Sequence, residues 1–269
     1  MRKTLAISCL IVSGIGFADS DEHTQGQSTF NWPGQYKAAV SLSYDDALNS
    51  QLDNVIPALN RYGFNATFFL TLSSPTLKTR LPDWRAAARQ GHELGNHTIN
   101  HGCRASLPGK EWVAPENDLD QKSIAEISQE VKNANTFLHA IDGEQMRTFT
   151  PPCIDIMVKD GNYLPAVSEQ FVGIKMLAAP PVTMQNFKPL NTPTWFPSGV
   201  SGEALINYVS DAARKGTLAS ITFHGVGGDH LQVSNQAHNE LLEYLDKHRE
   251  TYWVDTFLNI SQHIQTQQK

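Results

Sequence analysis

The feature that most constrains the fold is a succession of short apolar segments that alternate with amphipathic ones along the chain. Residues 66–70 are nearly all apolar, as is typical of a strand buried on both faces of a parallel sheet. Residues 48–59 and 205–213 instead place their apolar side chains on one helical face, and Gly63 and Gly216 follow them as helix stops. Alternating strands and helices predict an α/β fold with a parallel sheet.

Seven or eight such units follow one another, and none of them carries the glycine-rich turn of a dinucleotide-binding sheet. This pattern favours a single-domain (β/α) barrel over an open, doubly wound sheet. Candidate reactive residues stand just after the strands, where a barrel exposes its catalytic groups. The expected strands are residues 38–44, 66–70, 147–149, 171–177, 194–196, 218–223 and 252–257, with further helices at residues 83–90, 123–138 and 234–245.

The first residues have the order of a secretory signal peptide. Met1-Arg2-Lys3 is positively charged, residues 5–15 are apolar but too few to cross a bilayer, and Ala18 precedes polar residues. We expect residues 1–18 to be removed on export to the periplasm or the outside, although a buried N-terminal strand or helix is the alternative. Residues 19–35 would then form a mobile N-terminal segment and residues 36–269 the catalytic domain.

Charge and hydropathy exclude two classes of partner. The formal net charge is −6, and no cluster of lysines and arginines occurs, so neither nucleic acid nor an anionic membrane is an expected partner. No stretch beyond the N-terminal run is long and apolar enough to predict a membrane span. The oligomeric state stays open.

Two cysteines remain once the predicted signal peptide, with Cys9, is removed. In an oxidising compartment, an even pair such as Cys103 and Cys153 predicts a disulfide. The alternative is two unrelated buried thiols.

Two histidines and two acids have the spacing of a metal site. His97 and His101 stand four residues apart, so both rings can reach one ion if the segment coils. Asp45 and Asp46 end a predicted strand, where a cation would remove their mutual repulsion and leave one carboxylate free to hold a proton. The alternatives are surface histidines without a ligand and a solvated turn or helix cap at the acids.

A third histidine ends another predicted strand. His224 follows residues 219–223 and precedes the glycine-rich residues 225–228. On the same barrel face as the acids it could protonate a leaving group, and the glycines would let substrate approach the backbone. A lone histidine in a buried strand is otherwise more often structural. Together, these residues indicate metal-assisted hydrolysis.

At these motifs the chain resembles the polysaccharide deacetylases of carbohydrate esterase family four. Residues 43–46 match the family's Thr-Phe-Asp-Asp motif, and residues 97–101 match its His-Ser/Thr-x-x-His motif. Residues 149–153 align with the Arg-x-Pro-Tyr region in degenerate form, and residues 222–224 align with the Leu-x-His motif. The resemblance spans residues 38–257.

The resemblance implies a distorted (β/α) barrel, usually of seven strands, that binds a divalent metal. Zinc is the expected metal, with cobalt or nickel as the alternatives. By position, Asp46, His97 and His101 would bind the metal, Asp45 would be the general base and His224 the general acid. Metal-activated water, deprotonated by the base, would attack an acetyl carbonyl, and the acid would protonate the departing amine or alkoxide.

The resemblance also points to residues that would contact substrate. The oxyanion would be held by the metal and by a backbone N–H near Cys153, next to Pro152. Trp195 and the long loop of residues 104–122 are candidates for the cleft wall, although an aromatic residue after a strand is as often part of the core.

Several positions depart from the family pattern. Ala47 replaces a glycine, Thr150 the arginine that orients the base, Cys153 a tyrosine, and Thr194 the aspartate that tunes the acid histidine. Arg147 could substitute for the missing arginine. The metal-binding and proton-transfer positions are all retained, but the residues that support them differ.

Two functions follow. The leading hypothesis is an exported, metal-dependent deacetylase that removes N- or O-acetyl groups from a glycan or oligosaccharide, cleaving a C–N bond other than a peptide bond or an acetyl ester. The alternative is a catalytically impaired carbohydrate-binding protein on the same metal-containing barrel. A hydrolase of small cyclic amides on a related barrel is disfavoured by the export signal.

Overall fold

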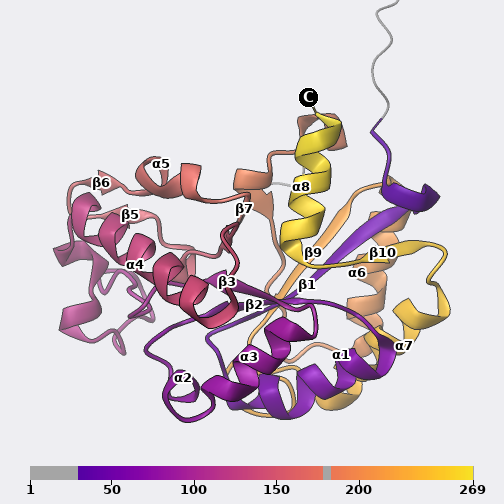
Figure 1. Cartoon of the computed structure of the whole chain (residues 1–269), viewed down its shortest axis with the longest axis horizontal. Helices are drawn as coiled ribbons and strands as arrows, with labels where there is room; N and C mark the ends of the chain where they lie inside the picture. The colour runs from indigo at the N-terminus through magenta and orange to yellow at the C-terminus, as the bar shows by residue number, and fades with distance from the viewer. Residues whose placement is uncertain (1–29, 178–182, 269) are drawn as a thin grey trace, which may run out of the picture.

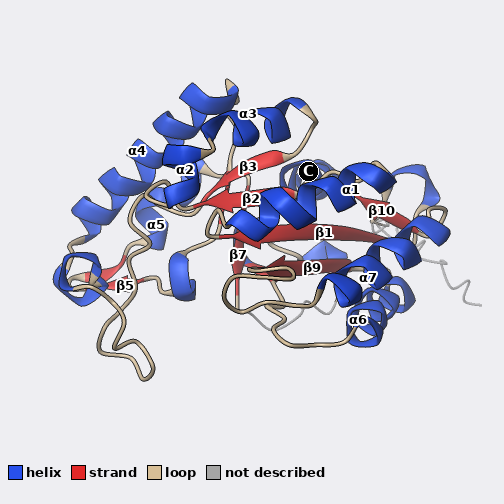
Figure 2. Ribbon diagram, turned by 90° about the horizontal axis from the view of Figure 1, so that it is seen from below, coloured by secondary structure: helices blue, strands red, loops and turns tan. Residues whose placement is uncertain are grey.

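The computed structural model describes residues 30–177 and 183–268 of the chain. Parallel strands form a curled sheet at the centre, and helices surround it (Figures 1 and 2). In chain order the strands of this sheet are β1 (Ala38–Asp45), β2 (Thr67–Leu70), β3 (Glu93–Asn96), β4 (Thr148–Phe149), β7 (Gly173–Met176), β8 (Thr192–Pro193), β9 (Leu218–Phe223) and β10 (Tyr252–Val254).

Seven of these eight parallel strands, all except β10, form a distorted barrel. β2, β3, β4, β7 and β8 follow one another in space from β1. Just beyond β8, Trp195 pairs with Ile221 of β9, and β9 pairs with residues 39–44 of β1. β10 pairs with β1 at the end opposite Asp45. The predicted single-domain α/β barrel is therefore confirmed.

Helices cover the outside of the sheet. They are α1 (Ile56–Tyr62), which continues a π-helical turn at Gln51–Val55, α2 (Pro75–Thr79), α3 (Leu81–Arg89), α4 (Ile124–Asp142), α5 (Leu164–Val167), α6 (Gly202–Lys215), α7 (Asn235–Lys247) and α8 (Phe257–Gln267). At α4, Ser123 and Glu126 form both bonds of a capping box. Helices α4 and α5 and the hairpin β5 (Met157–Val158) and β6 (Gly161–Asn162) lie together at one end of the molecule. None of the helices in the described ranges combines the length and the apolar character needed to cross a bilayer.

Several elements differ from the sequence-based expectation. Helices α2, α5 and α8 and the hairpin of β5 and β6 were not predicted, and the strand expected at residues 194–196 lies at Thr192–Pro193, as β8. β3 was not predicted, because its buried positions include Glu93 and Gly95, which do not form an apolar run. The strand packs too closely for a side chain at Gly95, which would lie 2.4 Å from the ring of Phe69. The predicted strand at residues 252–257 is shorter, because the Thr256 hydroxyl accepts a hydrogen bond from the Asn259 N–H and begins α8 there.

The end of the predicted mobile N-terminal segment also needs correction. Within residues 30–35, Trp32 is buried, and its Nε1–H donates to the carbonyl of Gly216 at 3.1 Å. Its ring stacks at 6.0 Å from that of His263. Residues 30–35 therefore pack against the barrel, because Trp32 finds an apolar site and a hydrogen-bond acceptor there. Residues 1–29, with the predicted signal peptide and most of the segment, lie outside the described ranges.

The interior of the barrel is polar near its centre. Lys175 is fully buried, and its Nζ donates to the Ser41 hydroxyl at 3.2 Å and to the Ile221 carbonyl at 3.3 Å. Glu93 accepts hydrogen bonds from the hydroxyls of Thr67 and Thr148. These bonds satisfy charges that burial would otherwise leave unpaired. The polar interior lies beneath the strand ends that carry the predicted site.

Candidate metal centre and substrate cleft

The predicted reactive residues meet in one cleft of about 900 Å³. It opens at the carboxyl ends of β1, β3 and β9, where Asp45 ends β1 and Asp46, His97 and His224 directly follow their strands. The parallel arrangement of the strands brings these ends to one rim, although the residues lie far apart in sequence.

The three predicted metal ligands converge. Asp46 Oδ1 lies 3.2 Å from His97 Nε2 and 3.1 Å from His101 Nε2, and the candidate ligand atoms all lie within 4.8 Å of one another. Oδ1 is nevertheless buried without a hydrogen-bond partner among the described residues. Close contacts that lack hydrogen-bond geometry are expected of ligands that share one ion, and two histidines with one carboxylate form a set that divalent zinc accepts. The residues therefore fit a divalent metal.

The loop that carries the histidines is not the helical turn considered from the spacing. Thr98 and His101 have φ of 63° and 54°, and Asp46 across the site has φ of 82°. Residues other than glycine rarely adopt such angles, and they occur most often at functional sites. The two rings meet through this bend, with their centroids 5.0 Å apart.

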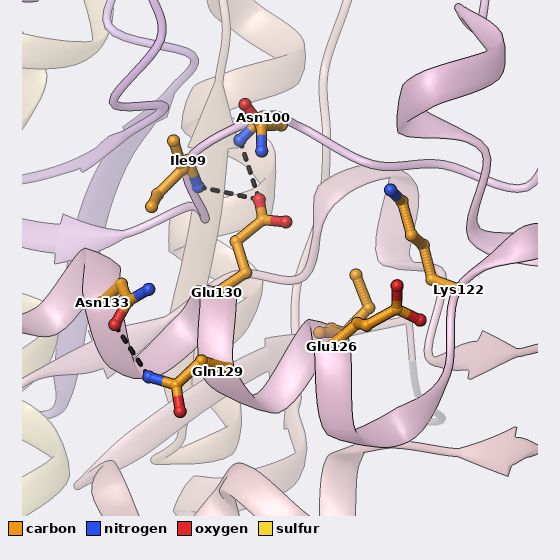
Figure 3. Close-up of a pocket in the computed structure, with 8 residues that line it drawn as sticks. Ile99, Asn100, Lys122, Glu126, Gln129, Glu130 and Asn133 are labelled. Carbon is orange, nitrogen blue, oxygen red and sulfur yellow. Dashed lines mark hydrogen bonds between the residues drawn. The ribbon is translucent and has the colours of Figure 1, made fainter.

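Hydrogen bonds hold the histidine loop from behind. The Nδ1–H of His97 donates to the Thr150 carbonyl at 2.6 Å, which leaves Nε2 free to bind a metal. Figure 3 shows Glu130 of α4 pointing at the outer side of the loop, where its carboxylate accepts the N–H groups of Ile99 and Asn100 at 3.1 and 2.8 Å. The hollow drawn in Figure 3 lies on the outer side of this loop, and the side chains labelled there do not point toward one common position, as metal ligands would.

Asp45 has the environment of a proton acceptor. The carboxylate is buried, Oδ2 lies 3.9 Å from His97 Nε2, and Oδ1 has no hydrogen-bond partner in the part of the chain that the structure describes. Burial raises the pKa of Asp45 to about 7, against the opposing effects of His97 and Lys175. A carboxyl group that titrates near neutrality, at the edge of a cleft, is suited to accepting a proton.

His224 stands on the other side of the metal ligands. Its Nε2 lies 3.9 Å from Asp46 Oδ2, and no carboxylate hydrogen-bonds its ring within the described ranges. Thr194, at the position of the family's aspartate, bonds instead to the Ser220 hydroxyl at 2.9 Å. Burial lowers the pKa of His224 to about 4. The predicted acid thus lies at the expected place without the carboxylate that would favour its protonated form.

A histidine that the sequence reasoning missed also reaches the site. His230 Nε2 lies 2.7 Å from Asp46 Oδ2. The hydrogen bond to Asp46 raises the pKa of His230. Its only signal in the sequence is its place six residues after His224, behind the glycine-rich turn.

The predicted disulfide is present and borders the cleft. Cys103 and Cys153 are bonded, with their Cα atoms 5.9 Å apart. Cys153 has φ of 57° and lines the cleft. Pro151 and Pro152 are both buried, and Pro151 lines the cleft, whereas Pro152 does not. The bridge joins the histidine loop to the loop that follows β4.

Two residues proposed for the site lie elsewhere. Trp195 packs on Tyr208 with ring centroids 4.8 Å apart, and its backbone pairs with β9, so Phe196 lines the cleft in its place. Arg147 forms a buried ion pair with Asp142 and is not a substitute for the missing arginine. Strand pairing of Trp195 fixes its side chain against α6 and away from the cleft.

Exposed apolar side chains form the rim of the cleft. Trp112, from the long loop that was predicted as a wall, is 60% exposed, and its ring lies 6.1 Å from that of His101. Leu177 and Leu231 are also exposed and line the same cleft. Large apolar side chains exposed together around a cleft indicate a ligand-binding surface.

Comparisons with known proteins agree with this geometry. Residues 34–159 match the family model described as polysaccharide deacetylase. The chain is 24% identical over 230 residues to a peptidoglycan-N-acetylglucosamine deacetylase of Bacillus cereus, covering 80% of this chain and 70% of that protein. It is 27% identical over 141 residues to a gellan lyase of a Bacillus species, a match that covers 51% of this chain but only 5% of that protein.

Solved structures share the fold. The CE4 domain of a multidomain xylanase from the hindgut metagenome of Trinervitermes trinervoides has a TM-score of 0.53 at 20% identity, covering 86% of this chain and 91% of that one. A CE4 family pseudoenzyme of Bacillus anthracis has a TM-score of 0.52 at 16% identity, covering 85% and 66%. A protein described as a pseudoenzyme is therefore among the structures that share this fold.

Proposed function

Because this chain is a divergent member of the polysaccharide deacetylase family, we propose that it is an exported, metal-dependent deacetylase of carbohydrates. The substrate would be an N- or O-acetylated glycan. The observation that carries the proposal is the convergence of Asp46 Oδ1 with the Nε2 atoms of His97 and His101, beside Asp45, whose Oδ1 has no hydrogen-bond partner among the described residues.

The proposed mechanism assigns a separate task to each side chain. Asp46, His97 and His101 would hold a divalent ion, which in such sites lowers the pKa of water and polarises a carbonyl group. Asp45 would accept a proton from the attacking water through its unpaired Oδ1. His224, across the ligands, would donate a proton to the departing amine or alkoxide.

The backbone and rim of the cleft would position the substrate. The backbone N–H of Cys153 is the candidate donor to the developing oxyanion, since this residue lines the cleft and its Sγ lies within 4.8 Å of a ring nitrogen of His101. Trp112 offers an exposed ring on which a sugar can stack, a few ångströms from the metal ligands. An apolar rim on a chain of net charge −6 suits a neutral glycan better than a polyanion.

Acetate release tests the proposal. Metal-free protein is loaded with zinc, cobalt or nickel and incubated with N-acetylated oligosaccharides of the chitin and peptidoglycan types and with O-acetylated xylan fragments. Loaded protein should release acetate, and Asp46→Ala or chelated protein should not. Full turnover by the metal-free protein would contradict the mechanism.

A second function is favoured by the surroundings of His224. Its ring has no carboxylate hydrogen-bond partner in the described ranges, and burial lowers its pKa to about 4, so at neutral pH it would be a poor acid. A carbohydrate-binding protein that retains the metal but has lost efficient turnover is the alternative. Glycan binding without acetate release, with all three metals supplied, would establish it.

Export is part of the proposal. The order of residues 1–18 supports it, and so does the Cys103–Cys153 bridge, because disulfides persist in oxidising compartments. The N-terminal sequence of protein recovered from periplasm or culture medium tests this directly. We expect it to begin at Asp19, and recovery of intact protein from the cytoplasm alone would contradict export.

A further inference from the structure

His230 contacts a metal ligand from the solvent side of the cleft. Its Nε2 lies 2.7 Å from Asp46 Oδ2, while Asp46 Oδ1 lies between the Nε2 atoms of His97 and His101. An ionised carboxylate only accepts hydrogen bonds, so the imidazole must donate through Nε2. The two oxygens of Asp46 therefore have separate partners, and His230 engages the one that points away from the histidine pair.

The loop that carries His230 has a fixed shape. The Gly225 N–H donates to the His230 carbonyl at 3.1 Å, and the Val233 N–H donates back to the Gly225 carbonyl at 3.1 Å. A side chain at Gly225 would lie 2.0 Å from the carbonyl oxygen of Gly228, so only glycine allows this turn. On either side of His230, Asp229 and Leu231 have φ of 63° and 47°. The loop thus holds His230 in one place at the cost of backbone strain.

The same loop is tied to the segment that follows Asp46. The Ser50 N–H donates to the Asp229 carboxylate at 2.8 Å, and the Asn54 amide donates to the Val226 carbonyl at 2.7 Å. The Val226 N–H returns a bond to the Ser50 hydroxyl at 3.3 Å. Because the two ends of the His230–Asp46 contact belong to segments bonded to each other, the fold brings the backbones of His230 and Asp46 close together.

Asp46 needs such support. It follows the last residue of β1 and has φ of 82°, so its backbone does not continue the strand that would otherwise fix its direction. The arginine that orients the neighbouring acid in the family is absent here, and Thr150 takes its place. A hydrogen bond to the free oxygen of a ligating carboxylate restricts its rotation and directs the other oxygen at the metal.

We propose that His230 is a positioning residue that holds Asp46 by Oδ2 and so keeps Oδ1 directed at the metal bound by His97 and His101. The inference rests on the proposed metal site. It assigns to the glycine-rich loop after His224 a role in metal affinity, which differs from the substrate contact expected from the sequence. Direct ligation of the metal by His230 is the competing explanation.

Zinc affinity measured against a competing chelator tests the proposal. We compare the native protein with His230→Ala, His230→Gln and, as a matched control, His139→Ala, an exposed histidine of α4 outside the cleft. The alanine variant should bind zinc 10- to 100-fold more weakly, as is typical when such a supporting hydrogen bond is lost. The glutamine variant should bind within a fewfold of the native protein, because its amide can donate to Asp46 while binding zinc poorly, and the control should match the native protein.

The outcomes separate the explanations. Equal zinc affinity in native and His230→Ala protein would overturn the inference while leaving the metal site intact. A glutamine variant as weak as the alanine variant would also overturn it, in favour of ligation. Native protein that binds no zinc would overturn the proposed function and this inference together. The visible spectrum of the cobalt-loaded protein adds a second readout, which should be the same in the native and glutamine proteins, and thermal unfolding of the metal-free variants confirms that they fold.

Discussion

Arg147 and Asp142 form a two-pronged ion pair whose side chains are each only 2% exposed. Nη2 lies 2.6 Å from Oδ1, and Nη1 lies 2.7 Å from Oδ2. Two further donations, to the carbonyls of Leu94 and Glu144, occupy the remaining hydrogens on these nitrogens. The guanidinium therefore joins the end of α4 to β3 and β4, and it has a structural role that keeps it from orienting Asp45.

Removing the carboxylate of this pair should destabilise the fold. In Asp142→Ala the guanidinium stays buried without its counter-ion, and we expect the free energy of unfolding to fall by about 3–5 kcal/mol. Urea denaturation measures the loss. Asp211→Ala is the matched control, because its ion pairs with Arg214 and Lys215 are exposed and are worth less than about 1 kcal/mol. Equal losses in the two variants would show that burial of the pair does not matter.

The disulfide should contribute strongly to stability. Cys103 and Cys153 are 50 residues apart, and closing a loop of this size in the unfolded chain stabilises the native state by about 4 kcal/mol. We expect reduction with dithiothreitol to lower the denaturation midpoint to that of the Cys103→Ser/Cys153→Ser double variant. The double variant itself should not respond to the reductant. A native protein that is unchanged after its thiols are shown to be free would contradict this.

The parts of the site that sequence reasoning recovered are those fixed by strand ends. Asp45 ends a strand and Asp46, His97 and His224 directly follow one, and parallel pairing must bring such positions to one rim. The cysteine pair was recoverable as well, because only two cysteines remain once the predicted signal peptide is set aside, which leaves one pairing. Local pattern and fold topology suffice for these residues.

The parts that were missed depend on contacts between distant segments. His230 reaches Asp46 only because its loop is bonded to Ser50 and Asn54, and no periodicity in the sequence encodes those bonds. Trp195 was considered for the cleft, but its pairing with β9 turns it onto α6, whereas Trp112 comes from an irregular loop. Backbone hydrogen bonds and loop shape, and not residue type, determine where the side chains of His230, Trp195 and Trp112 lie.

Trp112 should act on substrate binding more than on turnover. Its ring is 60% exposed beside His101, where a sugar can stack on it. In Trp112→Ala we expect KM to rise roughly fivefold, which corresponds to about 1 kcal/mol of stacking, with kcat little changed. Steady-state acetate release measures both constants. Phe137→Ala, an equally exposed aromatic residue of α4 that does not line the cleft, is the control. A fall in kcat at constant KM would instead place Trp112 in the chemical step.

His92 should make stability depend on pH in the acidic range. Its ring is buried, with Nδ1 accepting the Ala66 N–H at 3.2 Å and Nε2 lying 3.2 Å from the Asn60 side-chain oxygen. Protonation would put a second donor against the Ala66 N–H, and burial lowers the pKa of His92 to about 4, below the 6.5 of an unperturbed histidine. The unfolded chain therefore takes up a proton first, so this stability is present above pH 6.5 and is lost as the pH falls from 6.5 to about 4. The loss is about 1.4 kcal/mol per pH unit across that window.

Urea denaturation of native protein and His92→Asn, which keeps an acceptor for Ala66 without titrating, should give a difference in unfolding free energy that shrinks over this range and is constant above it. A difference that stays the same from pH 7 to 4 would show that His92 has the same pKa in the folded and the unfolded protein.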